Sequence, residues 1–268
     1  MAQHSPLAIK YAQRSDTGRQ RRLNEDTSAV HELVIAGQQA IIIAIADGMG
    51  GARAGAEASQ LAVSTAVQTL TTRLLVQVPT SEEQWQMVLS ETLQAANGAV
   101  HDRSHSQSQL AGMGTTLLVA VVWSRRVRIA HIGDCRAYVV RPAVRRPHIF
   151  QLTADHTVVA ELVTRGAISP ADASQHPQRH QLARSLGTTP QVEPELTART
   201  LRSGERLLLC TDGLPLHVAD NELARVVSDA ETPETACDRL IELTNQRGGR
   251  DNVTTVVLVA DREPVLSP

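Results

Sequence analysis

Apolar and polar residues are arranged along this chain in two ways, which predict strands in some segments and helices in others. Two apolar, β-branched runs, 27–36 and 40–46, flank Gly37-Gln38-Gln39 and predict a hairpin with a short turn. Similar short runs predict strands at 7–15, 115–123, 126–132, 136–141, 148–153, 195–201, 205–211 and 252–260.

Longer segments have apolar residues at helical spacing. They predict helices at 52–75, 81–104, 157–166, 220–228 and 233–247. Ser81-Glu82-Glu83-Gln84 has the pattern of a capping box. Thr232 stands before Pro233 as an N-cap.

The order of these elements indicates the fold class. Strands occur in hairpin-like groups and helices in two pairs, without strict strand–helix alternation, which favours an α+β fold of stacked antiparallel sheets covered by paired helices. No internal repeat or long linker is visible, so we expect residues 1–268 to form a single domain with a core of about 7–260. The polar, irregular segment 167–186 predicts a mobile flap within about 157–190.

Composition excludes several classes of function. The formal net charge is -2 and aromatic residues are 2% of the chain, which argues against nucleic-acid binding. Three distant cysteines indicate neither a disulfide framework nor a zinc pattern. No apolar run reaches the ~18 residues of a membrane span, and residues 1–10 have no signal-peptide core. We therefore expect a cytoplasmic protein without membrane contact.

Carboxylates recur beside glycines or other carboxylates where predicted strands end or begin. Asp47 and Asp212 each follow an apolar strand and precede a glycine, and Asp251 lies just before the last strand. Glu25-Asp26 and Asp134 occupy comparable positions. Because converging carboxylates repel one another unless cations lie among them, the pattern predicts a site for hard, oxygen-liganded metal ions.

Each motif alone also has a plain structural interpretation. Asp-Gly is a common turn, and Asp134 is either a ligand or a turn residue. Glu25 and Asp26 are neighbours whose side chains would point to opposite faces of a strand, so one would face the site directly and the other would act through water or the backbone. Arg21 is suited to bind a phosphate because its planar fork donates two hydrogen bonds, although an Arg-Arg pair is more often simply exposed.

The ordered set of motifs resembles the metal-dependent serine/threonine protein phosphatases, the PPM or type 2C family. The resemblance covers about residues 7–260, and the Asp-Gly-Met-Gly-Gly form is similar to the bacterial branch. It is carried by Arg21-x-x-Asn-Glu-Asp26, Asp47-Gly-Met-Gly-Gly51, Gly114-Thr-Thr116, Gly133-Asp-Cys-Arg-Ala-Tyr138, Leu152-Thr-x-Asp-His156, Leu182-Ala-Arg-Ser-Leu-Gly187, Cys210-Thr-Asp-Gly-Leu214 and Gly248-Gly-x-Asp-Asn252.

The resemblance implies a four-layer α-β-β-α sandwich and a centre of two Mn²⁺ or Mg²⁺ ions. By motif position, Asp47 would bridge the two ions and the Gly48 carbonyl would bind the second. Asp212 and Asp251 would bind the first ion, and Asp134 with Asp212 matches a third site of bacterial members. Glu25 and Asp26 would act through ion-bound water, and Arg21 would bind the phosphate.

Three positions depart from the family pattern. Met49 stands where many eukaryotic members have a histidine proposed as general acid, Cys135 replaces a serine, and Pro215 follows the Cys-Thr-Asp-Gly-Leu motif. The thiol of Cys135 is expected to make its corner of the site sensitive to oxidation. His131 and His156 lie beside motif residues, and structural hydrogen bonds are the expectation for both, because carboxylate sites for Mg²⁺ or Mn²⁺ seldom need imidazole.

These motifs predict a protein serine/threonine phosphatase that uses a water nucleophile activated at the metal pair. Its partners would be phosphoproteins produced by a serine/threonine kinase, and a monomer is the family-like expectation. Two alternatives stay open. One is a phosphoprotein-binding pseudophosphatase, which usually lacks some of the carboxylates. The other is a metal-dependent hydrolase of a non-protein phosphoester.

Overall fold

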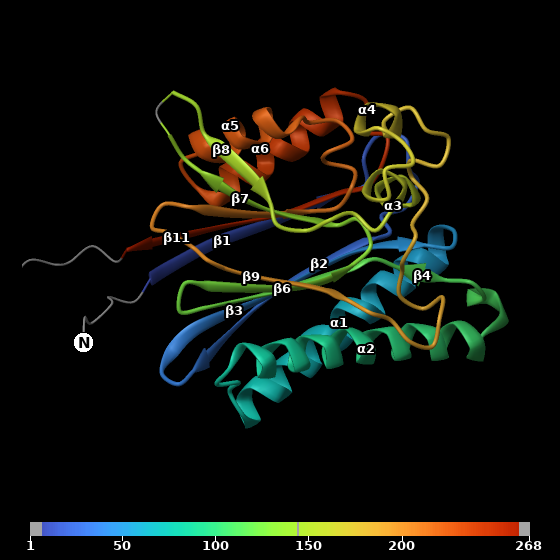
Figure 1. Cartoon of the computed structure of the whole chain (residues 1–268), viewed down its shortest axis with the longest axis horizontal. Helices are drawn as coiled ribbons and strands as arrows, with labels where there is room; N and C mark the ends of the chain where they lie inside the picture. The colour runs from blue at the N-terminus through green and yellow to red at the C-terminus, as the bar shows by residue number, and fades with distance from the viewer. Residues whose placement is uncertain (1–6, 144, 263–268) are drawn as a thin grey trace, which may run out of the picture.

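Two sheets pack face to face, and a pair of helices covers the outer face of each (Figure 1). This computed structural model describes residues 7–143 and 145–262. The strands are β1 (Leu7–Asp16), β2 (Asp26–Ile35), β3 (Gln38–Met49), β4 (Gly114–Thr115), β5 (Leu117–Trp123), β6 (Arg126–Ile132), β7 (Arg136–Arg141), β8 (His148–Gln151), β9 (Glu195–Thr200), β10 (Arg206–Cys210) and β11 (Val253–Arg262).

The helices are α1 (Ala52–Val76), α2 (Glu82–Ser106), α3 (Val158–Thr164), α4 (Pro170–Ala173), α5 (Asp220–Asp229) and α6 (Pro233–Gln246), with a 3-10 turn at Ser108–Leu110. One sheet has the order β1-β11-β10-β7-β8, and the other has the order β2-β3-β5-β6-β9, with β4 pairing β3. Every pairing is antiparallel. The predicted α+β sandwich with four layers is confirmed.

Three apolar clusters fill the spaces between the layers. The alternation of β3 shows how they form: Ile41, Ile43 and Ile45 pack between the two sheets, whereas Ile42 and Ala44 pack toward α1 and α2. A third cluster lies between the other sheet and helices α5 and α6. A strand that is buried on both faces in this way positions the residues at its end firmly.

Two turn predictions were wrong in position. The hairpin turn is at Ala36-Gly37, which have φ of 48° and 76°, so Gln38 and Gln39 belong to β3. Asp47 and Gly48 are also in β3 instead of a glycine turn, because Gly48 pairs with Thr115 of β4. The predicted strand 115–123 is interrupted at Thr116. Asp47 is therefore held by a ladder on both sides.

The predicted flap contains α3 and α4 and folds back over the end of the sandwich (Figure 1). Thr157 caps α3, and Ser169 and Asp172 form a capping box at α4. Isolated bridges join Thr157 to Leu182 and Thr115 to Leu186, so both ends of the segment are attached to the fold.

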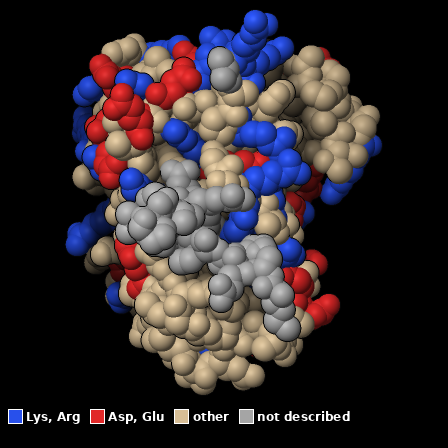
Figure 2. All heavy atoms as spheres, turned by 90° about the vertical axis from the view of Figure 1, so that its left-hand side faces the viewer, with Lys and Arg blue, Asp and Glu red and all other residues tan. Residues whose placement is uncertain are grey.

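The surface gives two further observations. Within residues 7–143 and 145–262, none of the helices combines the length and apolarity that a bilayer span requires. Figure 2 views the end of the molecule away from α3 and α4, where acidic and basic side chains both occur and neither sign forms an uninterrupted patch.

Candidate metal centre

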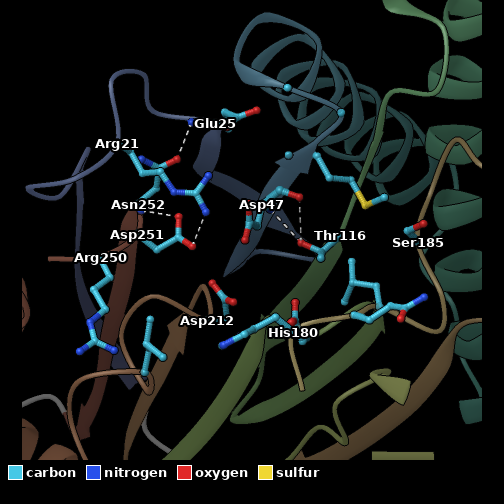
Figure 3. Close-up of a pocket in the computed structure, with 18 of the residues that line it drawn as sticks. Arg21, Glu25, Asp47, Thr116, His180, Ser185, Asp212, Arg250, Asp251 and Asn252 are labelled. Carbon is cyan, nitrogen blue, oxygen red and sulfur yellow. Dashed lines mark hydrogen bonds and ion pairs between the residues drawn. The ribbon is translucent and has the colours of Figure 1, made fainter. Parts of the chain in front are cut away.

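A cavity of about 1110 Å³ opens at the end of the sandwich beneath the flap. Five carboxylates from five separate parts of the chain line it: Glu25, Asp47, Asp134, Asp212 and Asp251. Figure 3 shows Asp47, Asp212 and Asp251 gathered around the same space. The structure thus brings together the acidic residues that the sequence pattern singled out, and Gly48 and Arg21 line the same cavity.

Asp47 is fixed through its own backbone. Its N–H donates to Thr116 Oγ1 at 2.8 Å, and its carbonyl accepts from Thr115 Oγ1 at 2.7 Å and from the Thr116 N–H at 2.9 Å. These contacts explain why the chain needs two hydroxyl residues where β4 meets β5. They leave the Asp47 carboxylate free to face the cavity.

Asp26 lies behind the cavity and does not line it. It pairs with Asp47 in the β2–β3 ladder, and its Oδ2 accepts from Thr211 Oγ1 and Thr254 Oγ1, each at 2.8 Å. Glu25, its neighbour, does line the cavity. The expectation that the two adjacent carboxylates face different environments is confirmed.

Asn252 fastens the loop that carries Arg21 and Glu25. Its Oδ1 accepts from the Glu25 N–H at 2.9 Å, and its Nδ2 donates to the carbonyls of Thr17 at 2.9 Å and Leu23 at 3.0 Å. One buried amide therefore connects the start of β11 to the β1–β2 loop, so Asp251 and Glu25 keep a fixed relative position.

Two arginines contact carboxylates near the centre. Arg21 donates to Asp251 Oδ2 at 2.8 Å, and its side chain is 48% exposed and reaches the cavity (Figure 3). Arg136 forms a fork with both oxygens of Asp155, with Nη2 2.6 Å from Oδ2. Arg136 thus braces the turn beside Asp134, whereas Arg21 is accessible to a ligand.

Glycines allow backbones to approach closely around the site. A Cβ on Gly48 would lie 2.0 Å from the Gly55 carbonyl oxygen, and one on Gly213 would lie 1.9 Å from the Asn252 carbonyl oxygen. No side chain fits at such distances. The glycines after Asp47 and Asp212 are therefore needed because another backbone segment lies too close to leave room for a side chain.

The carboxylates are electrostatically unfavourable by themselves. Burial, followed by the charges of Asp26 and Asp212, raises the pKa of Asp47 well above its ordinary value. Burial and the Asp212 charge also raise the pKa of Asp134 well above its ordinary value. Burial raises the pKa of Asp212 to about 6 and the pKa of Asp26 to about 7, although the two threonine hydroxyls favour its charged form. Cations would remove this cost.

Unpartnered oxygens test whether the residues present fit metal ions. Glu25 Oε1, Asp26 Oδ1 and Asp212 Oδ1 are buried and have no hydrogen-bond partner among the residues that the structure describes. Buried polar atoms almost always have a partner, and carboxylate oxygens without donors are suitable ligands for Mg²⁺ or Mn²⁺, directly or through water. The residues present fit a centre for divalent cations.

His131 and His156 make structural hydrogen bonds, as expected. His131 Nε2 donates to the Ala154 carbonyl at 2.8 Å, and His156 Nδ1 accepts from the Gly133 N–H at 3.2 Å. Potential ligand atoms of these histidines and Glu195 lie within 4.8 Å of one another. However, the rings are stacked with 17° between their planes. Because imidazole lone pairs lie in the ring planes, the two rings do not converge on one ion.

Cys135 is buried behind the centre, with Sγ 3.1 Å from Thr116 Oγ1. Burial raises the pKa of its thiol well above the ordinary value. Because the thiolate is the form that is readily oxidised, this environment protects the residue. It argues against the oxidation sensitivity expected from the sequence.

Three supporting residues received no role from the sequence, although Thr116 and Asn252 belong to motifs that carry the family resemblance. Thr116 holds Asp47, and Thr254 holds Asp26. Asn252 holds the loop before Glu25. A weak signal existed for Thr254, because Thr254 and Thr255 are the two hydroxyl residues in an otherwise apolar run at 253–260. Its partner is 228 residues away in the chain, so the spacing of residues could not reveal the contact.

Comparisons with known proteins agree with this architecture. The family model described as Protein phosphatase 2C matches residues 18–254. The serine/threonine protein phosphatase PstP of Mycobacterium tuberculosis is 40% identical over 253 residues, which are 94% of this chain and 45% of that protein. The chain thus spans less than half the length of this relative.

Two further comparisons cover nearly the whole of the matched chain. The serine/threonine phosphatase stp of Listeria monocytogenes is 38% identical over 250 residues, covering 92% of this chain and 94% of that protein. The crystal structure of the catalytic domain of PstP in complex with two manganese ions matches with a TM-score of 0.78 and 34% identity, covering 95% of this chain and 99% of that chain. This chain therefore belongs to the protein phosphatase 2C family.

Proposed function

We propose that this protein hydrolyses phosphoserine and phosphothreonine in proteins and depends on Mn²⁺ or Mg²⁺. The observation that carries the proposal is the cavity with five converging carboxylates. Buried oxygens of Glu25 and Asp212 in this cavity, and of Asp26 behind it, lack a hydrogen-bond donor among the described residues. Membership of the protein phosphatase 2C family supports it. The substrates would be products of a serine/threonine kinase. A monomeric state and a cytoplasmic location stay predictions.

In this proposal each carboxylate has a ligand role that depends on its position. Asp47 would be shared by two ions, with the Gly48 carbonyl contributing to one of them and Asp212 and Asp251 to the other. Asp134, which lines the same cavity, would serve a third ion. When bound, such a pair of divalent ions neutralises phosphate charge and lowers the pKa of water.

The remaining residues position these groups and the substrate. Glu25 and Asp26 would each act through one water molecule; the placement of Asp26 behind Asp47 supports an indirect role. Arg21 would bind the phosphate with its exposed guanidinium, since charge-assisted hydrogen bonds to phosphate oxygens are strong. Met49 lines the cavity and has no proton to give, so this side chain cannot act as a general acid.

Two other functions use the same site. A pseudophosphatase would bind phosphoproteins without turnover, and the presence of the full carboxylate set argues against it. A hydrolase of a small phosphoester would need the same ions, and the open cavity does not exclude such substrates. The choice between protein and small-molecule substrates requires a direct comparison of rates.

The test measures phosphate release from a phosphothreonine peptide and from an aryl phosphate, with Mn²⁺ and with a chelator. We expect hydrolysis of both with Mn²⁺, loss with the chelator, and loss in Asp47→Ala and Asp212→Ala proteins whose circular dichroism is unchanged. Absence of hydrolysis of either compound in the presence of Mn²⁺ would refute the proposal. Hydrolysis of the aryl phosphate alone would favour a small-molecule substrate.

A further inference from the structure

The rim of the cavity has a composition that the carboxylate centre does not require. Three separate walls form it: the β1–β2 loop, the segments beside β10 and β11, and the flap. Besides Arg21, which faces the centre, each wall brings one arginine and one leucine to the cavity. These pairs are Arg22 with Leu23, Arg250 with Leu216, and Arg179 with Leu182.

The three rim arginines have no carboxylate partner within the part of the chain that the structure describes. The Arg179 guanidinium donates to the carbonyl of His176 at 3.5 Å. Figure 3 shows the Arg250 side chain extending away from Asp47 and Asp212. Arg21 differs, because it faces the centre and pairs with Asp251. The rim charges are therefore not used to balance the central carboxylates.

Two of the three rim leucines are also exposed, whereas Leu182 is half-buried. Leu23 is 50% exposed and Leu216 is 39% exposed, which makes them two of the seven large apolar side chains described as exposed. Exposed apolar residues beside unpaired arginines are typical of surfaces that bind a peptide. Leucine side chains contact apolar groups of a ligand, and arginines donate paired hydrogen bonds to its carboxylates or phosphates.

We propose that this rim selects phosphopeptides that carry a second anionic residue close to the phosphoresidue, with Arg22 and Arg250 binding the second anion. The anion is either a carboxylate or another phosphate. The inference rests on the proposed function, since the phosphoresidue itself would occupy the carboxylate centre. The preference for a second anion would then come from rim side chains that lie outside the carboxylate centre.

The experiment compares three peptides around one phosphothreonine: neutral flanks, glutamate flanks, and a flanking phosphothreonine in its non-hydrolysable phosphonate form. Proteins carry Arg22→Gln, Arg250→Gln or both changes. Arg239→Gln is the matched control, because Arg239 is an exposed arginine of α6 that does not line the cavity. The readout is kcat/KM for each anionic peptide divided by kcat/KM for the neutral peptide.

We expect the wild type and the Arg239→Gln protein to prefer both anionic peptides. Each rim substitution should lower the preference for glutamate roughly two- to fivefold, as for exposed ion pairs, and should lower the preference for the phosphonate further because phosphate accepts stronger charge-assisted bonds. Raising the salt concentration from about 50 to about 500 mM should reduce the preference in the wild type. A loss of preference confined to one of the two anionic peptides identifies the anion.

Equal kcat/KM for neutral and anionic peptides in the wild type would overturn the inference, as would a preference that survives both substitutions. Failure of the proposed function is distinguishable, because the neutral peptide and an aryl phosphate would then not be hydrolysed. In that case, fluorescence anisotropy with the labelled phosphonate peptide decides the matter: weaker binding by the double variant supports the rim, and unchanged binding refutes it.

Discussion

The carboxylate beneath the cavity offers a prediction that does not depend on turnover. Asp26 is 8% exposed, and one of its oxygens has no hydrogen-bond partner. Asparagine has the same shape, and its oxygen can still accept from Thr211 and Thr254. The change Asp26→Asn therefore removes a buried charge while keeping the two observed hydrogen bonds.

The pKa of Asp26 indicates the size of the effect. A pKa of about 7 instead of 3.8 corresponds to about 4 kcal/mol at pH 8, at ~1.36 kcal/mol for each pH unit. Burial is the main cause of this shift, and Asp212 and Asp251 add repulsion that the remaining carboxylates share, so we expect roughly half of this in a single variant. The metal-free variant should then unfold about 4–8 °C above metal-free wild type at pH 8.

The pH dependence has a defined sign. A raised pKa in the folded state means that the wild type regains stability as the pH falls through about 7, because the folded protein binds the proton more tightly than the unfolded chain. The gap between the variant and the wild type should therefore shrink between about pH 8 and pH 4. Thermal unfolding in a chelator, followed by circular dichroism, measures it. A variant that is less stable than wild type at pH 8, or a gap independent of pH, would refute the reasoning.

Two further substitutions test the backbone and the substrate contact. In Gly48→Ala, the new Cβ meets the Gly55 carbonyl oxygen at 2.0 Å, so we expect a loss of about 3 kcal/mol or more in thermal unfolding; Gly98→Ala, which meets nothing within 4 Å in α2, should be neutral or stabilising. Arg21→Ala should raise KM for a phosphopeptide about tenfold in steady-state kinetics, and unchanged KM and kcat would exclude Arg21 from the site.

Most of the fold was predictable because its strands and helices have strong local patterns. The isoleucine run of β3 and the caps at Ser81 and Thr232 are examples, and both caps accept a backbone hydrogen bond. The capping box predicted at Ser81 is only half formed, because the Gln84 side chain accepts from the Thr80 N–H instead of the Ser81 N–H. The last residues of β3 were misassigned, because pairing of Gly48 with Thr115 extends the strand. That pairing is tertiary and has no local signal.

The sequence predicted which residues form the candidate site, but it did not predict how their side chains are oriented. The order of motifs identified the carboxylates, and all the predicted site residues except Asp26 line one cavity. The direction in which a carboxylate points depends on partners far away in the sequence, such as Thr211 for Asp26 and Arg21 for Asp251. Likewise, the rim arginines become notable only when the structure shows that they lack acidic partners.

The central claim is that the converging carboxylates hold at least two divalent ions on which hydrolysis depends. The most direct measurement is calorimetric titration of Mn²⁺ into metal-free protein, with phosphothreonine-peptide hydrolysis followed over the same titration. We predict at least two ions per chain, activity that rises with the second ion, and loss of both signals in Asp212→Asn. Fewer than two bound ions, or full hydrolysis by metal-free protein, would contradict the account.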